Sequence, residues 1–344
     1  MSLIRVGVVG VGIRGRHALE IPLSGMDGVR LKAVSFYPES EPVLWEGGGE
    51  ASAIDYAKRY GAEYVEDWRM LVRRDDIDLI SVMVEPAKTA EVVREAAAAG
   101  KAMVCDKPIA VHVRDAESIC RAVAAAGVPM LVFFWLRHTA SFRHISNRLT
   151  AGEIGKPLAA SVELWMDGGP LPGFRATKAY VDSYGGGEVT NFGCYAIDYL
   201  CRLLGEPVAV QAMLSDAFYD DYAQVGMESL GTVLIKFASG AVGHLVTGRI
   251  PGKAGCPIIR ASVTGEKGTL YADGAQLSAN VYGEQDARLE MAPKAQEELL
   301  ADFVRELRTG SWSGNLPGAE DALAVTKVLR AVYRSAQIQE QVLL

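Results

Sequence analysis

The sequence predicts an α/β protein of two domains. An N-terminal domain built on a parallel sheet precedes an α+β domain with a large, mainly antiparallel open sheet. Over about the first 135 residues, short Val- and Ile-rich segments alternate with longer helical periods, which is the pattern of β-α-β units. After Pro157 the strands lengthen and alternate apolar with polar residues, which is typical of antiparallel strands with one solvated face.

In the first domain, the predicted strands are short and apolar, and several of the helices between them end at glycine. Helices are expected over 51–60, 90–99 and 115–126, with Gly61, Gly100 and Gly127 following them, because glycine is common just beyond the last residue of a helix. The strands are expected over 4–9, 29–35, 63–64, 79–84, 102–105 and 130–134.

In the second domain, strands are expected at 159–166, 208–214, 231–237 and 241–247. The last two flank the short segment 238–240 and predict a hairpin. Helices are expected at 189–204, 296–309 and 319–336, the last returning toward the first domain. We therefore expect domain boundaries at 1–135 and 136–317, with 318–344 as a C-terminal helical segment.

Composition excludes several classes of protein. The net charge of −7 and the absence of a basic block argue against a nucleic-acid partner, because such binding needs Lys and Arg to neutralise phosphates. The longest apolar run, 128–136, is far shorter than the roughly 20 residues that span a bilayer, so no membrane segment is expected. The first residues show no secretory signal, so a cytoplasmic protein is expected.

Cysteine and histidine usage predicts neither disulfides nor a metal site. The five cysteines are odd in number and form no C-x-x-C pair, which favours reduced structural thiols. The five histidines lack the spacing of zinc ligands. We expect no metal in the site.

The first strand leads into the glycine-rich segment 10–15, GVGIRG, and then into a helix. Gly10 permits a tight turn, Gly12 lets the backbone approach a pyrophosphate, and Gly15 allows close packing of helix on strand. The helix N-terminus offers N–H groups to the anion. This placement predicts a dinucleotide-binding Rossmann domain whose loop also brings Ile13 and Arg14 to the cofactor; the alternative is a turn that only packs.

The end of the second strand lacks the acidic residue that usually binds the adenosine ribose. Ser35 and Phe36 stand there instead. Ser35 and Arg14 together suit a 2'-phosphate, since guanidinium matches phosphate geometry. The cofactor is therefore expected to be NAD(P), with NADP(H) favoured. The alternative is that Glu39 or Glu41 supplies the missing carboxylate.

Five segments in order along the chain carry a family resemblance. They are 99–108 (AGKAMVCDKP), 151–157 (AGEIGKP), 185–187 (GGG), 264–268 (TGEKG) and 333–335 (YRS). The chain resembles the glucose-fructose oxidoreductase / inositol dehydrogenase / rhizopine-catabolism (Gfo/Idh/MocA) family, with Asp106 replacing the usual Glu of its EKP motif. The resemblance implies an NAD(P)-dependent dehydrogenase or reductase acting on CH–OH groups of a sugar, sugar derivative, cyclitol or diol.

The resemblance also implies what each domain does. Residues 1–135 would bind the dinucleotide, and residues 136–317 would bind a small polyhydroxylated substrate. Relatives bury the open sheet of the second domain against a partner, so a homo-oligomer, dimer or tetramer, is expected.

Lys107 is the first candidate catalytic residue. The resemblance implies that it lies beside the nicotinamide ribose and the substrate hydroxyl, with Pro108 shaping the turn that presents it. An ammonium at the carboxyl edge of a parallel sheet, where ligands bind, stabilises a developing alkoxide. Without the resemblance, a solvated surface lysine would be the simpler interpretation.

Two further candidates lie on the helix after the triple glycine. At 3.6 residues per turn, Asn191, Tyr195 and Asp198 share a face that looks into a cleft. Many relatives have Asp-x-x-x-His here, so Tyr195 takes the histidine position and would move the substrate proton. A nearby Lys107 ammonium lowers the pKa of a phenol. Asn191 would orient the hydroxyl, and both side chains have a purely structural alternative.

Other departures from the family pattern surround the site. Glu85 and Pro86 replace a Pro-Asn pair, and Trp135 either walls the nicotinamide or simply packs. In the loop before the triple glycine Lys178 is the candidate sugar ligand, with Arg175, Tyr180 and Tyr184 as further possibilities and a solvated loop as the alternative. The expected cofactor residues are Gly10, Gly12, Ile13, Arg14, Gly15, Ser35, Phe36, Val84, Glu85, Asp106, Lys107 and Trp135, and the expected substrate residues are Lys107, Lys178, Asn191 and Tyr195.

Asn191 and the altered Glu85-Pro86 edge leave a second function open. A protein that kept the fold and lost the chemistry would sense a nicotinamide cofactor or a sugar without turning it over. Retention of Lys107 and Tyr195 favours the enzyme.

Overall fold

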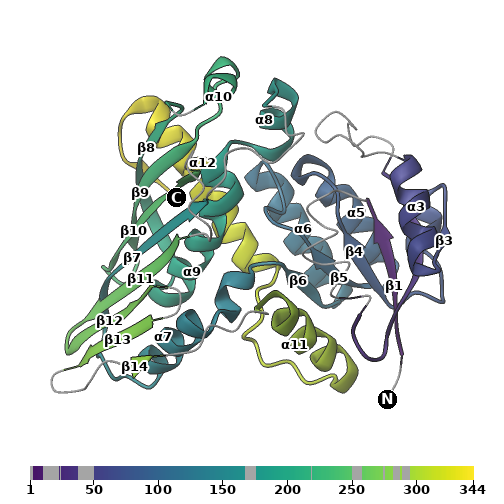
Figure 1. The fold of residues 1–344 in the computed structure, drawn as a ribbon, viewed down its shortest axis with the longest axis horizontal. Coiled ribbons are helices and arrows are strands. Elements are labelled where there is room, and N and C mark those ends of the chain that lie inside the picture. Colours follow the sequence, from purple (N-terminus) through teal and green to yellow (C-terminus); the bar gives the residue numbers. More distant parts are fainter. Residues whose placement is uncertain are drawn as a thin grey trace.

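The computed structural model describes residues 3–10, 23, 25–37, 50–166, 176–217, 219–249, 258–273, 276–281, 287–288 and 295–344. These residues form two sheets, with helices packed between and around them (Figure 1). The glycine-rich segment from Val11 to Gly15 lies outside the described residues, as do Glu39, Glu41 and Arg175.

The first sheet is parallel throughout its described strands, as the sequence predicts. Its strands are β1 (Ile4–Val9), β2 (Val29–Ser35), β3 (Glu63–Tyr64), β4 (Leu79–Val82), β5 (Ala102–Cys105) and β6 (Met130–Val132). Their order is β3-β2-β1-β4-β5-β6. β4 and β6 end two residues earlier than expected, because helices start at Pro86 and Trp135. Proline suits the first turn of a helix, where no N–H is needed.

The helices of this domain are α3 (Glu50–Tyr60), α4 (Trp68–Val72), α5 (Pro86–Ala98), α6 (Val113–Ala126) and the 3₁₀ turn η3 (Trp135–His138). Asp67 caps α4 by accepting the Arg69 N–H at 2.9 Å. α6 ends at Gly127, whose φ of 63° lies in the left-handed region. α5 and α6 pack side by side over the sheet (Figure 1).

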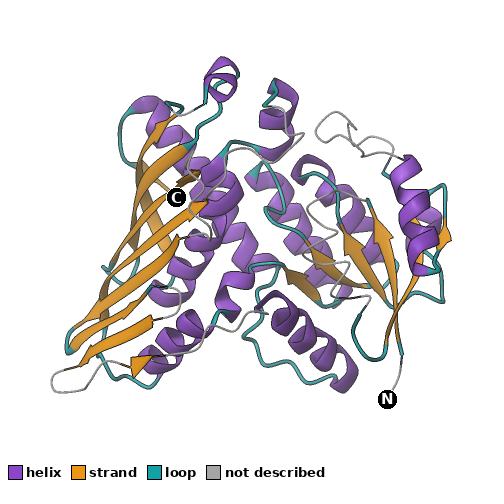
Figure 2. Cartoon of the chain, viewed as in Figure 1, coloured by secondary structure: helices purple, strands orange, loops and turns teal. Residues whose placement is uncertain are grey.

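The second sheet is large and mixed, with one parallel pair among antiparallel ones (Figure 2). Its strands are β7 (Pro157–Met166), β8 (Pro207–Ser215), β9 (Leu230–Phe237), β10 (Val242–Arg249), β11 (Ile258–Gly265), β12 (Gly268–Ala272), β13 (Gln276–Val281), β14 (Ala287–Arg288) and β15 (Val342–Leu343). Their order is β14-β13-β12-β11-β7-β10-β9-β8-β15. β9 and β10 form the predicted hairpin, and β7 pairs with β10 in parallel.

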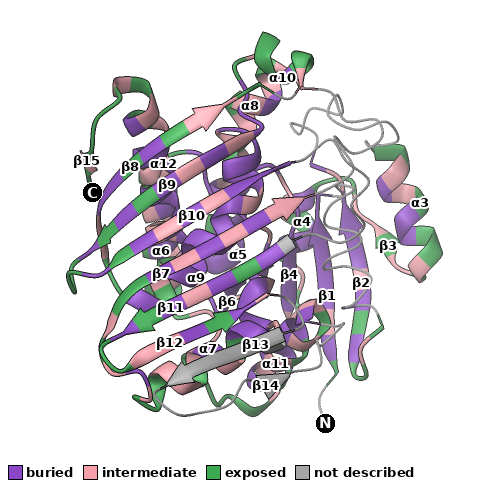
Figure 3. Cartoon of the chain, turned by 60° about the vertical axis from the view of Figure 1, so that its left-hand side comes forward, coloured by how far each residue is buried: buried purple, intermediate pink, exposed green. Residues whose placement is uncertain are grey.

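The strands of this sheet alternate between an inner and an outer face (Figure 3). In β9, Val233 and Ile235 are buried, whereas Leu234 and Lys236 are exposed. A helix that follows the triple glycine, α9 (Cys194–Leu204), packs on the inner face against β7 and β10. The described residues leave the outer face without a helix over it (Figure 3).

The remaining helices are α7 (Ala140–Thr150), α8 (Lys178–Tyr184), α10 (Asp220–Gln224), α11 (Ala295–Thr309) and α12 (Ala319–Ile338). α12 contacts β8 and α9 of the second domain and α6 and β6 of the first. In Figure 1 it runs between the two sheets. It therefore belongs to the packing of both domains.

A group of three charged residues links η3, α9 and α12, and we call it the interdomain clamp. Arg137 on η3 donates through Nε to Asp198 Oδ2 at 2.6 Å and through Nη2 to Asp198 Oδ1 at 2.5 Å. The same Nη2 donates to Asp321 of α12 at 2.7 Å. Asp198 is fully buried on α9, whereas the Asp321 side chain is 36% exposed, so the clamp ties three elements together with one end open to solvent.

The described residues contain neither a membrane-spanning helix nor a metal cluster. None of their helices combines the length and apolar character needed to cross a membrane. They also contain no group of three His, Cys, Asp or Glu side chains placed to hold a metal ion. Cys105, Cys120, Cys194 and Cys201 are free thiols.

Candidate active site

Lys107 follows β5 at the carboxyl edge of the parallel sheet, as expected for a ligand-binding position. Its backbone N–H donates to the Asp106 carboxylate at 2.8 Å, and its peptide bond to Pro108 is cis. The residue is only 8% exposed. Lys107 is therefore not a solvated surface lysine.

The triple glycine forms a tight turn that only glycine fits. Gly186 has a φ of 151°, and a Cβ there would lie 1.8 Å from the hydroxyl of Tyr333. The buried Glu228 carboxylate accepts the N–H of Gly187 at 2.9 Å and of Val189 at 2.9 Å. Tyr333 on α12 donates its hydroxyl to the same carboxylate at 2.7 Å. The turn is thus held by the segment before β9 on one side and by α12 on the other.

The helix after this turn differs from the one predicted. Val189–Gly193 form a π-helical turn, and the α-helix begins only at Cys194. π-Turns are wider than α-turns and are often found at functional sites. Asn191 and Tyr195 lie together at the site. Asp198, expected on the same face, accepts hydrogen bonds from Arg137 in the interdomain clamp.

The structure brings Lys107 of the first domain to Asn191 and Tyr195 of the second. The Lys107 Nζ donates to the main-chain oxygen of Asn191 and to its Oδ1 at 3.3 Å. The same Nζ lies 4.5 Å from the centroid of the Tyr195 ring and 5.7 Å from that of Phe192. An ammonium and a phenol thus occupy one buried location between the domains.

Two aromatic side chains from the end of the first domain pack around the phenol. The rings of Trp135 and Tyr195 meet edge-on with centroids 5.6 Å apart, and Phe134 contacts Tyr195 in the same manner at 6.3 Å. Such edge-to-face pairs are favourable arrangements of aromatic rings. Trp135 therefore contacts the ring of Tyr195.

A buried acid next to Asn191 was missed by the sequence analysis. Glu188 is 2% exposed, and its Oε2 accepts the Asn191 Nδ2–H at 3.1 Å. Its Oε1 accepts from Arg249 Nε at 2.7 Å and from the Tyr222 hydroxyl at 2.9 Å. The available signal was a charged residue directly after a triple glycine and before an apolar helix.

At the cofactor edge, Gly10 follows β1 with a φ of 82°. A Cβ there would lie 2.6 Å from the carbonyl oxygen of Met83, so the turn needs glycine. Ser35 is fully buried, and its hydroxyl donates to the carbonyl oxygen of Phe36 at 3.3 Å. This bond is internal to the end of β2.

Two other predicted cofactor residues lie where β4 meets α5. Val84 is half-buried, and its methyl group would lie 2.9 Å from a Cβ on Gly10. Glu85 precedes the first residue of α5 and is buried. Both stand at the carboxyl edge of the sheet beside the turn at Gly10.

The structure places the candidate sugar ligand Lys178 on the surface. Its side chain is 70% exposed on α8 and pairs with Asp182 one turn away. Tyr180 is buried and stacks on Tyr184 with ring centroids 4.5 Å apart. Tyr180 also belongs to a small apolar cluster with Tyr222, the residue that donates to Glu188.

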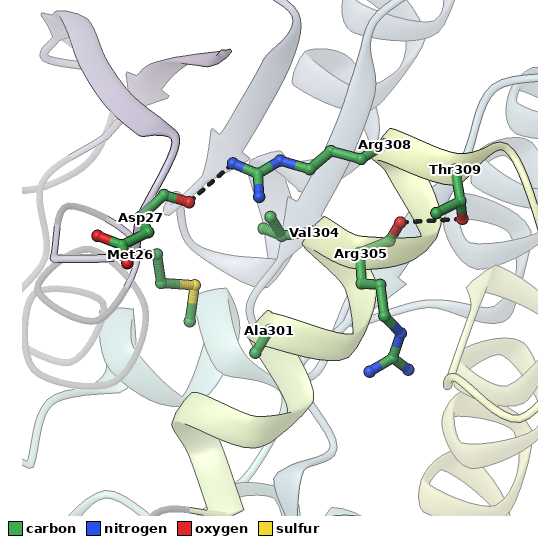
Figure 4. A pocket seen from close by; sticks show the side chains of 7 residues that line it. All are labelled: Met26, Asp27, Ala301, Val304, Arg305, Arg308 and Thr309. Atoms are coloured by element: carbon green, nitrogen blue, oxygen red, sulfur yellow. Dashed lines mark hydrogen bonds between the residues drawn. The ribbon is translucent and has the colours of Figure 1, made fainter. Parts of the chain in front are cut away.

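A cavity of about 520 Å³ lies elsewhere, between Met26–Asp27 and α11 (Figure 4). Arg308 reaches across it and donates to the Asp27 carbonyl oxygen at 2.7 Å. None of its lining residues belongs to the group around Lys107. It is separate from the candidate active site.

Comparison with known families and structures agrees with this geometry. Residues 4–134 match the model of an oxidoreductase family with an NAD-binding Rossmann fold. Residues 142–271 match the model of the GFO/IDH/MocA C-terminal domain. The two matches fall on the two sheets and leave only a short junction between them.

Curated relatives and solved structures point the same way. Levoglucosan dehydrogenase of Pseudarthrobacter phenanthrenivorans is 27% identical over 71% of this chain and 67% of its own. The scyllo-inositol 2-dehydrogenase (NAD(+)) of Bacillus subtilis is 23% identical over 78% and 73%.

Among solved structures, levoglucosan dehydrogenase in complex with NADH and L-sorbose superimposes with a TM-score of 0.83. The two sequences are 21% identical, and the match covers 100% of this chain and 99% of the other. A putative myo-inositol dehydrogenase from Sinorhizobium meliloti 1021 gives 0.78 at 22% identity, covering 99% of both chains. At these identities the likeness shows a shared fold.

The predicted resemblance is confirmed by the family models, which fall on both domains in the expected order. The chain belongs to the Gfo/Idh/MocA family of oxidoreductases and carries its NAD-binding Rossmann fold.

Proposed function

We propose that the protein transfers hydride between a nicotinamide dinucleotide and a hydroxyl- or carbonyl-bearing carbon of a sugar, sugar derivative, cyclitol or diol. One observation carries the proposal. The Lys107 ammonium, bonded to Asn191, lies 4.5 Å from the ring of Tyr195. A cation and a phenol held together out of water suit the removal of a proton from a hydroxyl.

Each side chain has a distinct task in this proposal. When bound, the nicotinamide ring supplies or accepts the hydride. The Tyr195 hydroxyl takes the proton from the substrate hydroxyl during oxidation and returns it during reduction. Lys107 stabilises negative charge on the phenol and on the substrate oxygen. The Asn191 amide cannot take up or release a proton in the reaction. Its proposed task is to orient, by hydrogen bonds, the groups next to it.

The turn at Gly10 fits a dinucleotide. A Cβ at Gly10 would collide with Met83, so the backbone turns tightly at the carboxyl edge of β1, where nucleotides bind in this fold. The residues proposed to line the cofactor remain those of the sequence prediction: Gly10, Gly12, Ile13, Arg14, Gly15, Ser35, Phe36, Val84, Glu85, Asp106, Lys107 and Trp135.

For the preferred dinucleotide we propose NADP(H). The end of β2 reads Ser35, Phe36, Tyr37, so no carboxylate there repels a 2'-phosphate. The buried bond between the Ser35 hydroxyl and Phe36 leaves Arg14 as the main proposed phosphate ligand. Levoglucosan dehydrogenase, by contrast, has been solved with NADH.

The proposed substrate class rests on the relatives. The named relatives include a levoglucosan dehydrogenase and a scyllo-inositol dehydrogenase, whose named substrates are polyhydroxylated rings. Lys178, which is exposed on α8, stays a proposed substrate ligand.

A titration followed by a screen tests the proposal. NADH and NADPH are titrated by fluorescence, and polyols, cyclitols and sugars are then assayed for absorbance change of the reduced nicotinamide. We expect turnover of at least one compound, and we expect Tyr195→Phe to lower it about 100-fold, the usual scale for a positioned acid-base group. Cofactor binding without turnover of any candidate would favour a sensor on the same fold.

We further propose a homo-oligomer, dimer or tetramer, formed through the outer face of the second sheet. That face carries the exposed apolar side chains Met213, Leu234 and Val242, with Met213 74% exposed. Polar residues stand opposite them in the strand register, and exposed apolar side chains on an uncovered sheet face suit burial against a partner. Light scattering should show a dimer or tetramer that Leu234→Asp weakens, and a monomer at all concentrations would refute the proposal.

A further inference from the structure

We propose that Glu188 is a positioning residue for the reaction. It holds the side-chain amide of Asn191 so that the amide oxygen faces the Lys107 ammonium. This inference rests on the function proposed above and assigns a role to a residue that the sequence pattern did not single out.

The two ends of the Asn191 amide face opposite chemical partners. A carboxylate only accepts hydrogen bonds, and an ammonium only donates them. Glu188 Oε2 therefore selects Nδ2, at 3.1 Å, and Lys107 Nζ selects Oδ1, at 3.3 Å. With both partners in place, only one of the two orientations of the amide satisfies all four atoms.

Glu188 is itself held rigidly. Arg249 at the end of β10 donates to its Oε1 at 2.7 Å, and Tyr222 of α10 donates at 2.9 Å. Arg249 is 4% exposed and its guanidinium lies 5.2 Å from the Phe192 ring. A buried carboxylate with an arginine and two further donors is fixed in place. This chain of hydrogen bonds therefore extends from β10 to the Lys107 amine.

The arrangement also explains why position 191 carries an amide in this chain. An aspartate there would set a second carboxylate about 3 Å from that of Glu188. Two carboxylates at such a distance do not both ionise at neutral pH. The identity of residue 191 and the presence of Glu188 are therefore coupled.

A double-mutant cycle tests this coupling. Wild type, Glu188→Gln, Asn191→Asp and the double variant are compared by kcat, KM and the pH profile of kcat. We expect Glu188→Gln to lower kcat about 10-fold or more with little change in KM. Asn191→Asp should lower kcat and move the pH profile, because its carboxyl shares a proton with Glu188.

The double variant carries the decisive expectation. The introduced glutamine would donate its amide N–H to the introduced aspartate, and the other oxygen of that carboxylate would still accept from Lys107. We expect its kcat to be at least about 10-fold higher than the product of the two single losses predicts. Losses that simply multiply would overturn the proposal.

Asp198→Asn is the matched control for folding. It also neutralises a buried carboxylate paired with an arginine, but this carboxylate is the one that accepts from Arg137 in the interdomain clamp. It should lower Tm comparably and leave kcat within about 3-fold. If Glu188→Gln does not fold, Tyr222→Phe removes one bond to Glu188 without a change of charge. A smaller loss of kcat is then expected, and an unchanged kcat would contradict the proposal.

A readout without turnover separates this inference from the proposed function. The ¹⁵N resonance of the Asn191 side-chain amide is assigned from its absence in Asn191→Asp. We expect Glu188→Gln to shift that resonance and speed its hydrogen exchange, and Asp198→Asn to leave it in place. If no substrate is turned over, the proposed function fails while this measurement still decides the role of Glu188. An unmoved resonance in Glu188→Gln would refute it.

Discussion

Two groups of side chains, each built around a buried cation, connect distant elements of the chain, and their cations bond different partners. In the interdomain clamp, Arg137 faces two carboxylates, Asp198 and Asp321, at 2.5 to 2.7 Å. At the candidate active site, Lys107 bonds two oxygens of Asn191, and both belong to neutral groups. We propose a division of tasks between the two groups: the interdomain clamp serves stability, whereas the Lys107 ammonium acts on the reacting groups.

Breaking the clamp should give the largest effect on folding. Asp198→Ala leaves the guanidinium of Arg137 buried with one carboxylate lost, and breaking a buried pair in this way costs about 3–5 kcal/mol of unfolding free energy. Urea denaturation measures the loss. The folded fraction should keep kcat within about 3-fold of wild type, since the Asp198 carboxylate is held by Arg137. A loss of turnover on the order of 100-fold without a loss of stability would reverse the proposed division of tasks.

Removing the cation of the active site should lower turnover strongly and stability only slightly. Lys107→Ala is expected to lower kcat about 100-fold and to change Tm by only a few degrees, because the Asn191 oxygens that Lys107 bonds are neutral. Steady-state kinetics and thermal denaturation on one preparation give both numbers. Near-normal turnover would remove Lys107 from the mechanism.

Glu228, whose carboxyl group holds the triple-glycine turn, should make the stability of the protein depend on pH. Burial raises the pKa of the Glu228 carboxyl above its usual 4.5. The native state therefore holds this proton more tightly than the unfolded chain. The associated stability is fully present below pH 4.5 and is lost as pH rises through the folded-state pKa.

Glu228→Gln stays neutral at every pH and should lack this loss. The Tm advantage of wild type over the variant should shrink by on the order of a few °C as pH rises from acid to neutral. Thermal unfolding of both proteins across that range measures the difference. An advantage that is constant or grows with pH would show that the carboxyl is not held protonated by burial.

The smallest effect is expected at the surface. Lys178 is mostly exposed and already pairs with Asp182, so Lys178→Ala should raise KM by no more than about 3-fold and leave kcat unchanged. It also serves as a matched lysine control for Lys107→Ala. A large fall in kcat would contradict this prediction. It would mean that α8 contacts the bound substrate more closely than the exposed pair of Lys178 and Asp182 indicates.

Much of the fold could be predicted because it rests on local signals. The strands β1, β2, β3 and β5 fall where their apolar runs predict them, and the hairpin of β9 and β10 follows from its short turn. Lys107 and Tyr195 could be proposed from motif position. Such signals depend on neighbours in sequence.

What could not be predicted depends on contacts distant in sequence. The π-turn at Val189–Gly193 sits over a glycine turn held by Glu228 and Tyr333. These partners come from segments about 40 and 140 residues away. The pairing of Glu188 with Arg249 is likewise remote. The partner of Asp198, Arg137, could not be predicted for the same reason, since it lies 61 residues away in the sequence.

The position of α12 has a consequence for how the protein matures during translation. The parallel sheet is completed by residue 132, and N-terminal domains generally fold first during synthesis. Yet Tyr333, which locks the turn before Asn191, and Asp321, which closes the clamp, are both on α12. During synthesis the nucleotide-binding domain can therefore fold before α12 exists. The candidate active site is complete only after the ribosome has added α12, which contacts both domains.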